Sequence, residues 1–108
     1  MDTFTEFVRD QLTGLKGLEM KRMFGGYGLY LGPAFIGILF EGKLFFKTNQ
    51  APLPKYKRLE SKPFEYQKKS KKVIRMKHYY QVPVEILEDS KRLKQWAMDC
   101  LASDRRTV

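Results

Sequence analysis

The sequence predicts a single α+β domain, in which one antiparallel sheet packs against helices from both ends of the chain. Two amphipathic helical patterns flank a central stretch where aromatic and β-branched residues alternate between turn signals. With 108 residues, 43% hydrophobic and 31% charged, the chain has the size and composition of one globular domain covering residues 1–108. We expect about five strands, in the order α-β-β-β-α-β-β-α.

The first helix is expected to have Thr3 as its N-terminal cap. Thr3 and Glu6 have the spacing of a capping box, in which the two side chains bind backbone amides of the first turn. Gly14 and Gly17 are expected to end the helix. Apolar residues recur between them at helical spacing and form one stripe that indicates a helix covering the sheet: Phe4, Phe7, Val8, Leu12 and Leu15.

Bulky and aromatic residues between positions 19 and 31 are interrupted by Gly25, Gly26 and Gly28. Glycine within a strand pattern marks a bulge, a bend or the close approach of another backbone. We therefore interpret residues 19–31 as one sharply bent strand. The alternative is a phosphate-binding loop, but Leu31 stands where the third glycine of that motif belongs, and the continuation is strand-like rather than helical.

A meander of two further strands is expected next. Residues 34–40 are apolar on both faces, which indicates a central strand entered through the turn Gly32-Pro33. Glu41-Gly42 is typical of a two-residue hairpin connection. In residues 43–48, Leu44, Phe46 and Thr48 then alternate with Lys43, Phe45 and Lys47, as in a strand with two different faces.

The second half of the chain predicts a short helix, a hairpin and a segment that closes the sheet. Residues 56–59 follow two prolines and are expected to be helical. Residues 63–67 and 73–77 are predicted strands, and residues 68–72 between them are too charged to be buried, so we place them at an exposed hairpin tip. Residues 78–83 close the sheet, and one helical turn is expected just after them.

The last helix has the clearest pattern in the chain. Asp89 or Ser90 is expected to cap its first turn. The apolar residues that follow lie three or four positions apart and form one stripe: Leu93, Trp96, Ala97, Cys100 and Leu101. This stripe predicts a second helix packed on the sheet.

The net charge of +9 is concentrated in one region. Ten basic residues lie between Lys55 and Lys77, opposed only by Glu60 and Glu65. Basic residues bind phosphates, and aromatic residues among them can stack on unpaired bases, so the region is a candidate contact for nucleic acid or an acidic protein. The alternative is that its lysines keep a sheet edge soluble and unpaired. The candidate contact residues are Lys68, Lys69, Lys71, Lys72, Arg75 and Lys77.

The sequence offers little for catalysis. His78 is the only histidine and Cys100 the only cysteine, too few for a closed zinc site. The pair could act as nucleophile and base, but Cys100 lies on the apolar stripe of a helix, where a free cysteine usually behaves as a small buried hydrophobe. We expect no catalytic residue, no metal and no cofactor.

Three general features bear on the location of the protein, and the edges of the sheet bear on its assembly. No apolar run approaches the ~20 residues needed to cross a bilayer, and the first residues lack the basic and apolar regions of a signal peptide. Together with the single cysteine, these features favour the cytoplasm. A small open sheet has edges that can pair with a second copy, so a homodimer is expected.

The segment Met23–Tyr30 resembles the hallmark of the TfoX N-terminal domain family. Later segments match in the same order: Phe45-Phe46-Lys47, Pro63-Phe64-Glu65-Tyr66, Val73-Ile74-Arg75-Met76, Tyr79-Tyr80-Gln81-Val82-Pro83, and the closing helix with Trp96 and Ala97. The resemblance implies a compact α+β fold similar to secretion chaperones. It supplies no catalytic or ligand residues that can be carried over to this chain.

Named members of that family are bacterial regulators of DNA uptake, in which this domain precedes a separate C-terminal domain. The resemblance covers residues 20–101 and therefore implies a stand-alone first domain, with the C-terminal domain absent. The function that it implies is a non-enzymatic regulatory domain that acts through protein contacts. The alternative, from the residues themselves, is a basic nucleic-acid-binding module that uses residues 55–77.

Overall fold

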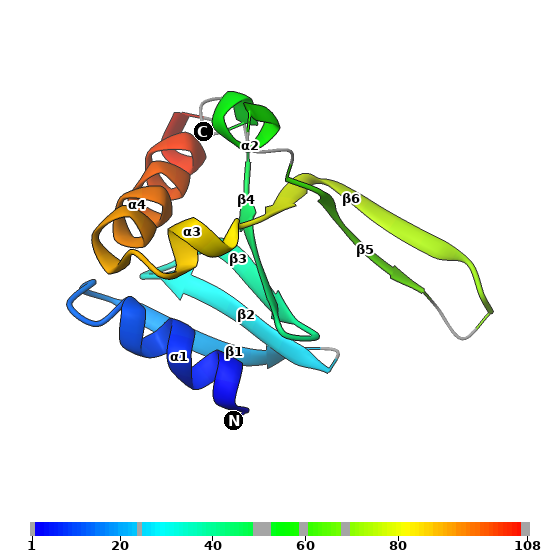
Figure 1. The fold of residues 1–108 in the computed structure, drawn as a ribbon, viewed down its shortest axis with the longest axis horizontal. Coiled ribbons are helices and arrows are strands. Elements are labelled where there is room, and N and C mark those ends of the chain that lie inside the picture. Colours follow the sequence, from blue (N-terminus) through cyan, green and yellow to red (C-terminus); the bar gives the residue numbers. More distant parts are fainter. Residues whose placement is uncertain (1, 24, 49–52, 59–60, 68–69, 107–108) are drawn as a thin grey trace.

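The computed structural model describes residues 2–23, 25–48, 53–58, 61–67 and 70–106 (Figure 1). The elements in chain order are α1 (Thr3–Gln11), β1 (Leu18–Met23), β2 (Gly26–Leu31), β3 (Ala34–Phe40), β4 (Lys43–Lys47), α2 (Leu53–Arg58), β5 (Pro63–Gln67), β6 (Val73–Gln81), α3 (Val84–Leu87) and α4 (Ser90–Arg106). The predicted α+β class, with helices at both ends of an antiparallel sheet, is confirmed.

The sheet contains six antiparallel strands in the order β1-β2-β3-β4-β6-β5, one more than expected. The prediction of a single bent strand over residues 19–31 is wrong, because this segment forms a hairpin in which Met23 pairs with Gly26. Gly25 lies in the turn with a φ of 79°, a conformation that glycine adopts without steric cost. The glycines thus mark a reversal of the chain rather than a bend within one strand.

The four described helices pack on one face of the sheet, around the main core (Figure 1). Each of them contributes buried side chains: Val8 from α1, Tyr56 from α2, Ile86 from α3, and Leu93, Trp96, Ala97 and Cys100 from α4. The predicted stripe of the last helix is therefore confirmed. Asp89 caps that helix, because its carboxylate accepts a hydrogen bond of 3.2 Å from the Arg92 amide.

The cap of α1 differs from the prediction. The carboxylate of Asp2, not the Thr3 hydroxyl, accepts the orphan amide of Thr5 at 2.7 Å, and this bond lowers the pKa of Asp2. Asp and Thr both serve at this position, and a carboxylate gains further from the positive end of the helix dipole. The helix therefore begins one residue earlier than the capping box predicted, at Thr3, with Asp2 as its cap.

The opposite face of the sheet, here called the outer face, carries a second and smaller aromatic cluster. Because strand residues alternate between faces, neighbours of main-core residues point to the outer face. Ile38, Phe45 and Phe64 are buried there. The half-buried side chains packed around them are Phe35, Phe40 and Tyr79. The two faces therefore differ: helices cover one, and side chains of the sheet itself fill the other.

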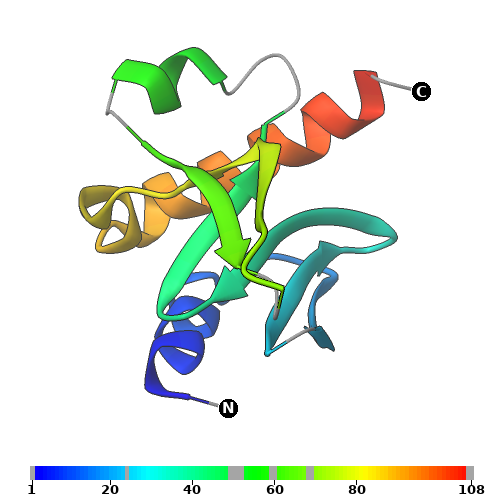
Figure 2. The same ribbon diagram turned by 90° about the vertical axis from the view of Figure 1, so that its right-hand side faces the viewer.

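Strands β5 and β6 form a two-stranded arm that reaches away from the rest of the molecule, and Figure 2 views the molecule along it. Pro63 pairs with Tyr80, but the next residue, Phe64, pairs with Met76, so β6 contains extra residues at this point. The backbone amide and the hydroxyl of Thr48 both donate to the carbonyl of His78 within this bulge. The bulge redirects the arm away from the sheet, as bulges do.

Helix α2 is held against α4 by one aromatic contact and one partly buried cation. The rings of Tyr56 and Trp96 lie 4.7 Å apart in an edge-to-face arrangement. The Lys55 ammonium lies 4.3 Å from the centre of the Trp96 ring and forms an ion pair with Asp99. Trp96 thus joins the two helices to the main core.

Removing the Tyr56 hydroxyl is expected to stabilise the domain. This oxygen is buried without a hydrogen-bond partner in the described part of the chain, and burial raises the pKa of the phenol. An unsatisfied buried hydroxyl costs about 1–3 kcal/mol, so Tyr56→Phe should raise the free energy of unfolding by about 1 kcal/mol in urea titrations. Tyr80→Phe, at a half-buried ring 6.3 Å away, is the control. A loss of stability in Tyr56→Phe alone would contradict the expectation.

Candidate interaction surfaces

The arm carries the part of the predicted basic contact that the structure describes. Lys71, Lys72 and Arg75 are all exposed, and Lys71 has a φ of 69° where the chain reverses between β5 and β6. Lys68 and Lys69 lie outside the described residues, and only the backbone of Lys77, within β6, is described. The predicted hairpin around these lysines is confirmed by the pairing of Gln67 with Val73.

One cation of the arm already has an acidic partner. The Arg75 guanidinium donates to the Glu65 carboxylate at 2.7 Å, across the two strands. Their side chains are 63% and 41% exposed, and ion pairs in such positions contribute about 0–1 kcal/mol. The pair can therefore open at little cost, and the guanidinium is then free to bind an external anion.

Two of the aromatic residues within the basic region cannot stack on a ligand. Tyr56 belongs to the main core and Phe64 to the outer-face cluster, and both are fully buried. Tyr79 and Tyr80 are half-buried, and the side chain of Tyr66 lies outside the described residues. Among the aromatic residues of this region whose side chains the structure describes, Tyr79 alone combines partial exposure with a place on the outer face.

Tyr79 instead joins two residues from the first half of the chain in what we call the aromatic row, formed by Tyr30, Phe35 and Tyr79. The ring centres of Tyr30 and Phe35 are 5.1 Å apart, and those of Phe35 and Tyr79 are 6.0 Å apart, with edge-to-face inclinations. All three rings are half-buried. The row crosses the outer face from β2 through β3 to β6.

Lysines flank the aromatic row. The Lys21 ammonium on β1 lies 5.0 Å from the centre of the Tyr30 ring. Lys47 on β4 is paired in register with Tyr79. Sequence inspection missed this site because its residues come from separate strands; the detectable signal was only that Tyr30 and Phe35 each stand between two core residues of their strand.

Glycine at position 28 makes room for the centre of the row. A Cβ added to Gly28 would lie 2.8 Å from the Phe35 ring, closer than real Cβ contacts. Gly26 has a different role, since a Cβ there would lie 2.1 Å from the carbonyl oxygen of Leu39 on β3. The glycine motif is therefore structural: it brings β2 and β3 together and seats Phe35, and the chain continues as a strand rather than as a phosphate-binding helix start.

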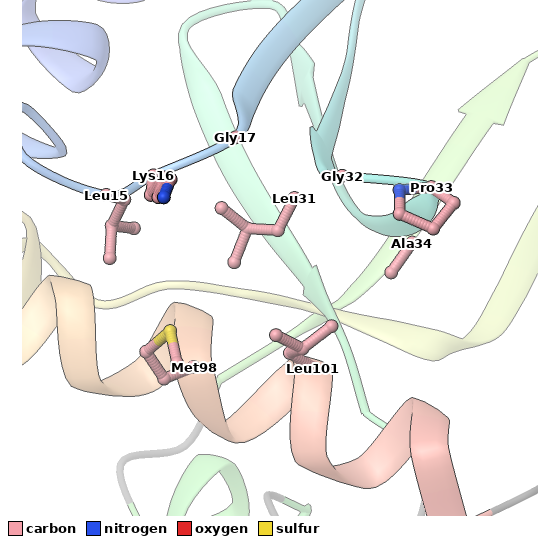
Figure 3. A pocket seen from close by; sticks show the side chains of 9 residues that line it. All are labelled: Leu15, Lys16, Gly17, Leu31, Gly32, Pro33, Ala34, Met98 and Leu101. Carbon is pink, nitrogen blue, oxygen red and sulfur yellow. The ribbon is translucent and has the colours of Figure 1, made fainter.

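An apolar pocket of about 550 Å³ opens on the helical side of the molecule (Figure 3). The α1–β1 connection, the end of β2, the β2–β3 turn and α4 form its walls. Its lining residues are Leu15, Lys16, Gly17, Leu31, Gly32, Pro33, Ala34, Met98 and Leu101. Lys16 is the only charged residue among these nine. The volume lies within the range of pockets that bind small molecules or anchoring side chains.

The pocket has one fixed wall and one adaptable wall. The Gly32 amide donates to the Gly17 carbonyl at 2.8 Å, which ties the β2–β3 turn to the start of β1. On the opposite side, α4 presents Met98, whose side chain is 43% exposed (Figure 3). Methionine is flexible and polarisable, so it adapts its shape to a bound apolar group.

The two residues considered for catalysis lie in different environments. Cys100 is buried in the main core, where desolvation raises the pKa of its thiol to about 12 and keeps it protonated near neutral pH. His78 is exposed on β6. Within the described ranges, no group of three or more His, Cys, Asp or Glu residues is arranged to hold a metal ion. Each helix in the same ranges is too short or too polar to cross a membrane.

Comparison with known sequences identifies the family of the chain. The family model of the TfoX N-terminal domain matches residues 10–103, which is nearly the whole chain. The match begins within α1 and includes all six strands of the sheet and most of α4. No curated protein matches the chain.

Proposed function

Because this chain belongs to the TfoX N-terminal domain family, we propose that it is a non-enzymatic regulatory domain that acts by binding another protein. The observation that carries this proposal is the apolar pocket with the exposed Met98 in its wall. Protein interfaces are centred on a few apolar anchors that fill such pockets, and methionine is enriched at them. The partner would insert an apolar side chain between α4 and the β2–β3 turn.

A charge placed in the pocket wall tests this proposal. Met98→Glu puts a carboxylate where the partner's apolar anchor would lie, so we expect at least about a tenfold loss of affinity for the partner. The partner is first captured from native extract on the immobilised domain, and its affinity is then measured by calorimetry with each purified variant.

Phe7→Glu provides the matched control, because Phe7 on α1 is also an exposed apolar residue, at 40% against 43% for Met98, and does not line the pocket. Met98→Leu, which stays apolar, should also retain binding. Equal affinities of wild type, Met98→Glu and Phe7→Glu for every captured protein would overturn the assignment of the pocket as the contact.

The arm supports a second candidate function, that of a basic nucleic-acid-binding module. Its described lysines are exposed on a projecting hairpin, and the region between Lys55 and Lys77 holds most of the net charge. Such a hairpin can follow a phosphate backbone, and binding by charge is recognised from its salt dependence.

Neutralising the arm should therefore reduce the salt dependence of nucleic-acid binding. In the combined variant Lys68→Gln, Lys69→Gln, Lys71→Gln and Lys72→Gln, the slope of log affinity against log salt should fall by up to roughly three for a single strand. Neutralising Lys91, Arg92 and Lys94 in the first turns of α4 is the control and should leave the slope nearly unchanged. Absence of binding by the wild type at low salt would remove this candidate.

A further inference from the structure

The aromatic row differs from the rest of the outer face in its exposure. Ile38, Phe45 and Phe64, at the base of the arm, are buried by one another and form a closed cluster. Tyr30, Phe35 and Tyr79 lie beside that cluster and remain half-buried. The four described helices all pack into the main core on the other face, so none of them covers the row.

Positive charge lies at the Tyr30 end of the row, on β4 between Phe35 and Tyr79, and beyond the row. Lys21 is placed above the ring of Tyr30, and Lys47 stands opposite Tyr79. Lys43 is exposed on the same face of β4, since it alternates with Leu44 of the main core. The arm begins at the Tyr79 end, and its exposed Lys71 and Lys72 lie where the chain reverses at its far end.

This combination matches the chemistry of one ligand. Non-specific single-strand binders use a cationic groove for the phosphates and aromatic rings on which successive bases stack. In a duplex the base faces are already stacked on each other and are not available to a protein ring. We propose that the aromatic row binds the bases of a single strand of DNA or RNA while the arm holds its phosphates; this rests on the second candidate function.

The test compares single-strand and duplex binding in two sets of variants. Tyr30→Leu and Tyr79→Leu remove the rings and keep apolar volume; Phe35 is left in place because it fills the space above Gly28. Fluorescence anisotropy is measured with labelled dT and rU strands of about twelve nucleotides, and with a duplex of equal length. We expect about tenfold weaker single-strand binding for each ring removed, an unchanged salt slope, and unchanged duplex affinity.

Two controls separate a binding effect from a change of fold. Tyr30→Phe and Tyr79→Phe keep the rings and should bind as the wild type does. Phe7→Leu removes an exposed ring from α1, which packs on the other face of the sheet, and should also have no effect. In NMR spectra of the wild type, the ring signals of Tyr30 and Tyr79 should shift when the single strand is added. This measurement needs no variant, so it can be made even if a leucine variant fails to fold.

The outcomes distinguish the inference from the function on which it rests. If the wild type binds neither strand nor duplex, both are overturned. If it binds through the arm lysines but the leucine variants retain single-strand affinity, or the tyrosine ring signals do not move, the row is not a base-binding site and only the arm assignment stands. If the leucine variants lose only single-strand binding and keep the salt dependence of the wild type, the result supports the aromatic row as a base-binding site.

Discussion

Gly26→Ala is expected to destabilise the domain by about 3 kcal/mol, the upper part of the usual range for forcing atoms into a packed site. The added methyl group would lie 2.1 Å from the Leu39 carbonyl oxygen, which belongs to the backbone of a central strand. A side chain could rotate away from it, but a paired strand can move only by giving up part of the β2–β3 ladder. The loss should appear as a lower urea midpoint.

Gly42→Asn is the control for this substitution. Gly42 lies in the β3–β4 turn with a φ of 71°, and nothing lies within 4 Å of an added Cβ. Asparagine tolerates this conformation, so the free energy of unfolding should change by less than about 1 kcal/mol. Equal losses in both variants would contradict the approach of β3 as the reason why glycine stands at position 26.

Trp96→Ala is expected to destabilise the domain by about 3–5 kcal/mol, as is typical for deleting a buried large aromatic side chain. The indole is 6% exposed and lies between the Tyr56 ring and the main core. Its loss opens a cavity under α2 and removes the aromatic partner of the Lys55 cation. The free energy of unfolding, measured by urea titration and followed by circular dichroism, should fall accordingly.

Trp96→Phe should lose much less stability, because it keeps an aromatic ring against Tyr56. Gln95→Ala, at an exposed position of the same helix, should change stability by less than about 0.5 kcal/mol. Comparable losses in Trp96→Ala and Gln95→Ala would contradict the assignment of the lost stability to the contacts of the indole. Retained stability in Trp96→Ala would contradict the place of the indole in the main core.

The elements with local determinants were predictable from the sequence. The alternation in residues 43–48 places Leu44 and Phe46 in the main core and Phe45 on the outer face, as the structure has them. The Glu41-Gly42 turn is confirmed, since Phe40 pairs with Lys43 and both turn residues have a positive φ. A two-residue turn and a period of two are properties of adjacent residues, so they can be read without knowledge of the rest of the chain.

The first hairpin was missed because a glycine in a strand pattern can have several different structural roles. Gly25 reverses the chain, whereas Gly26 admits the backbone of β3 and Gly28 admits a ring of β3. The last two depend on residues from positions 35 and 39, and their closeness exists only once β2 and β3 have paired. Glycine therefore serves both to reverse the chain and to allow the close approach of β3, and only the tertiary structure distinguishes these two roles.

The candidate surfaces also differ in how far they could be predicted from the sequence. The arm is a continuous charged segment, so its place at a hairpin was predictable from composition. The aromatic row and the apolar pocket each combine segments that are distant in the chain, from β2 to β6 and from the α1–β1 connection to α4. Burial also decides which aromatic residues are available to stack on a ligand. Tyr56 and Phe64 belong to the basic region of the sequence, but both are buried and cannot do so.

The space above Gly28 couples two positions that are seven residues apart. A Cβ at position 28 would lie 2.8 Å from the ring of residue 35 and 2.9 Å from the Met23 sulfur, so a side chain there requires a smaller residue at position 35 and a shift of the flexible Met23 side chain. Homologous chains should therefore show correlated exchange, with alanine or serine at position 28 accompanied by a smaller aliphatic residue at position 35. Such chains would lose the middle ring of the three, and so the pair of positions would indicate from sequence alone which homologues share this surface.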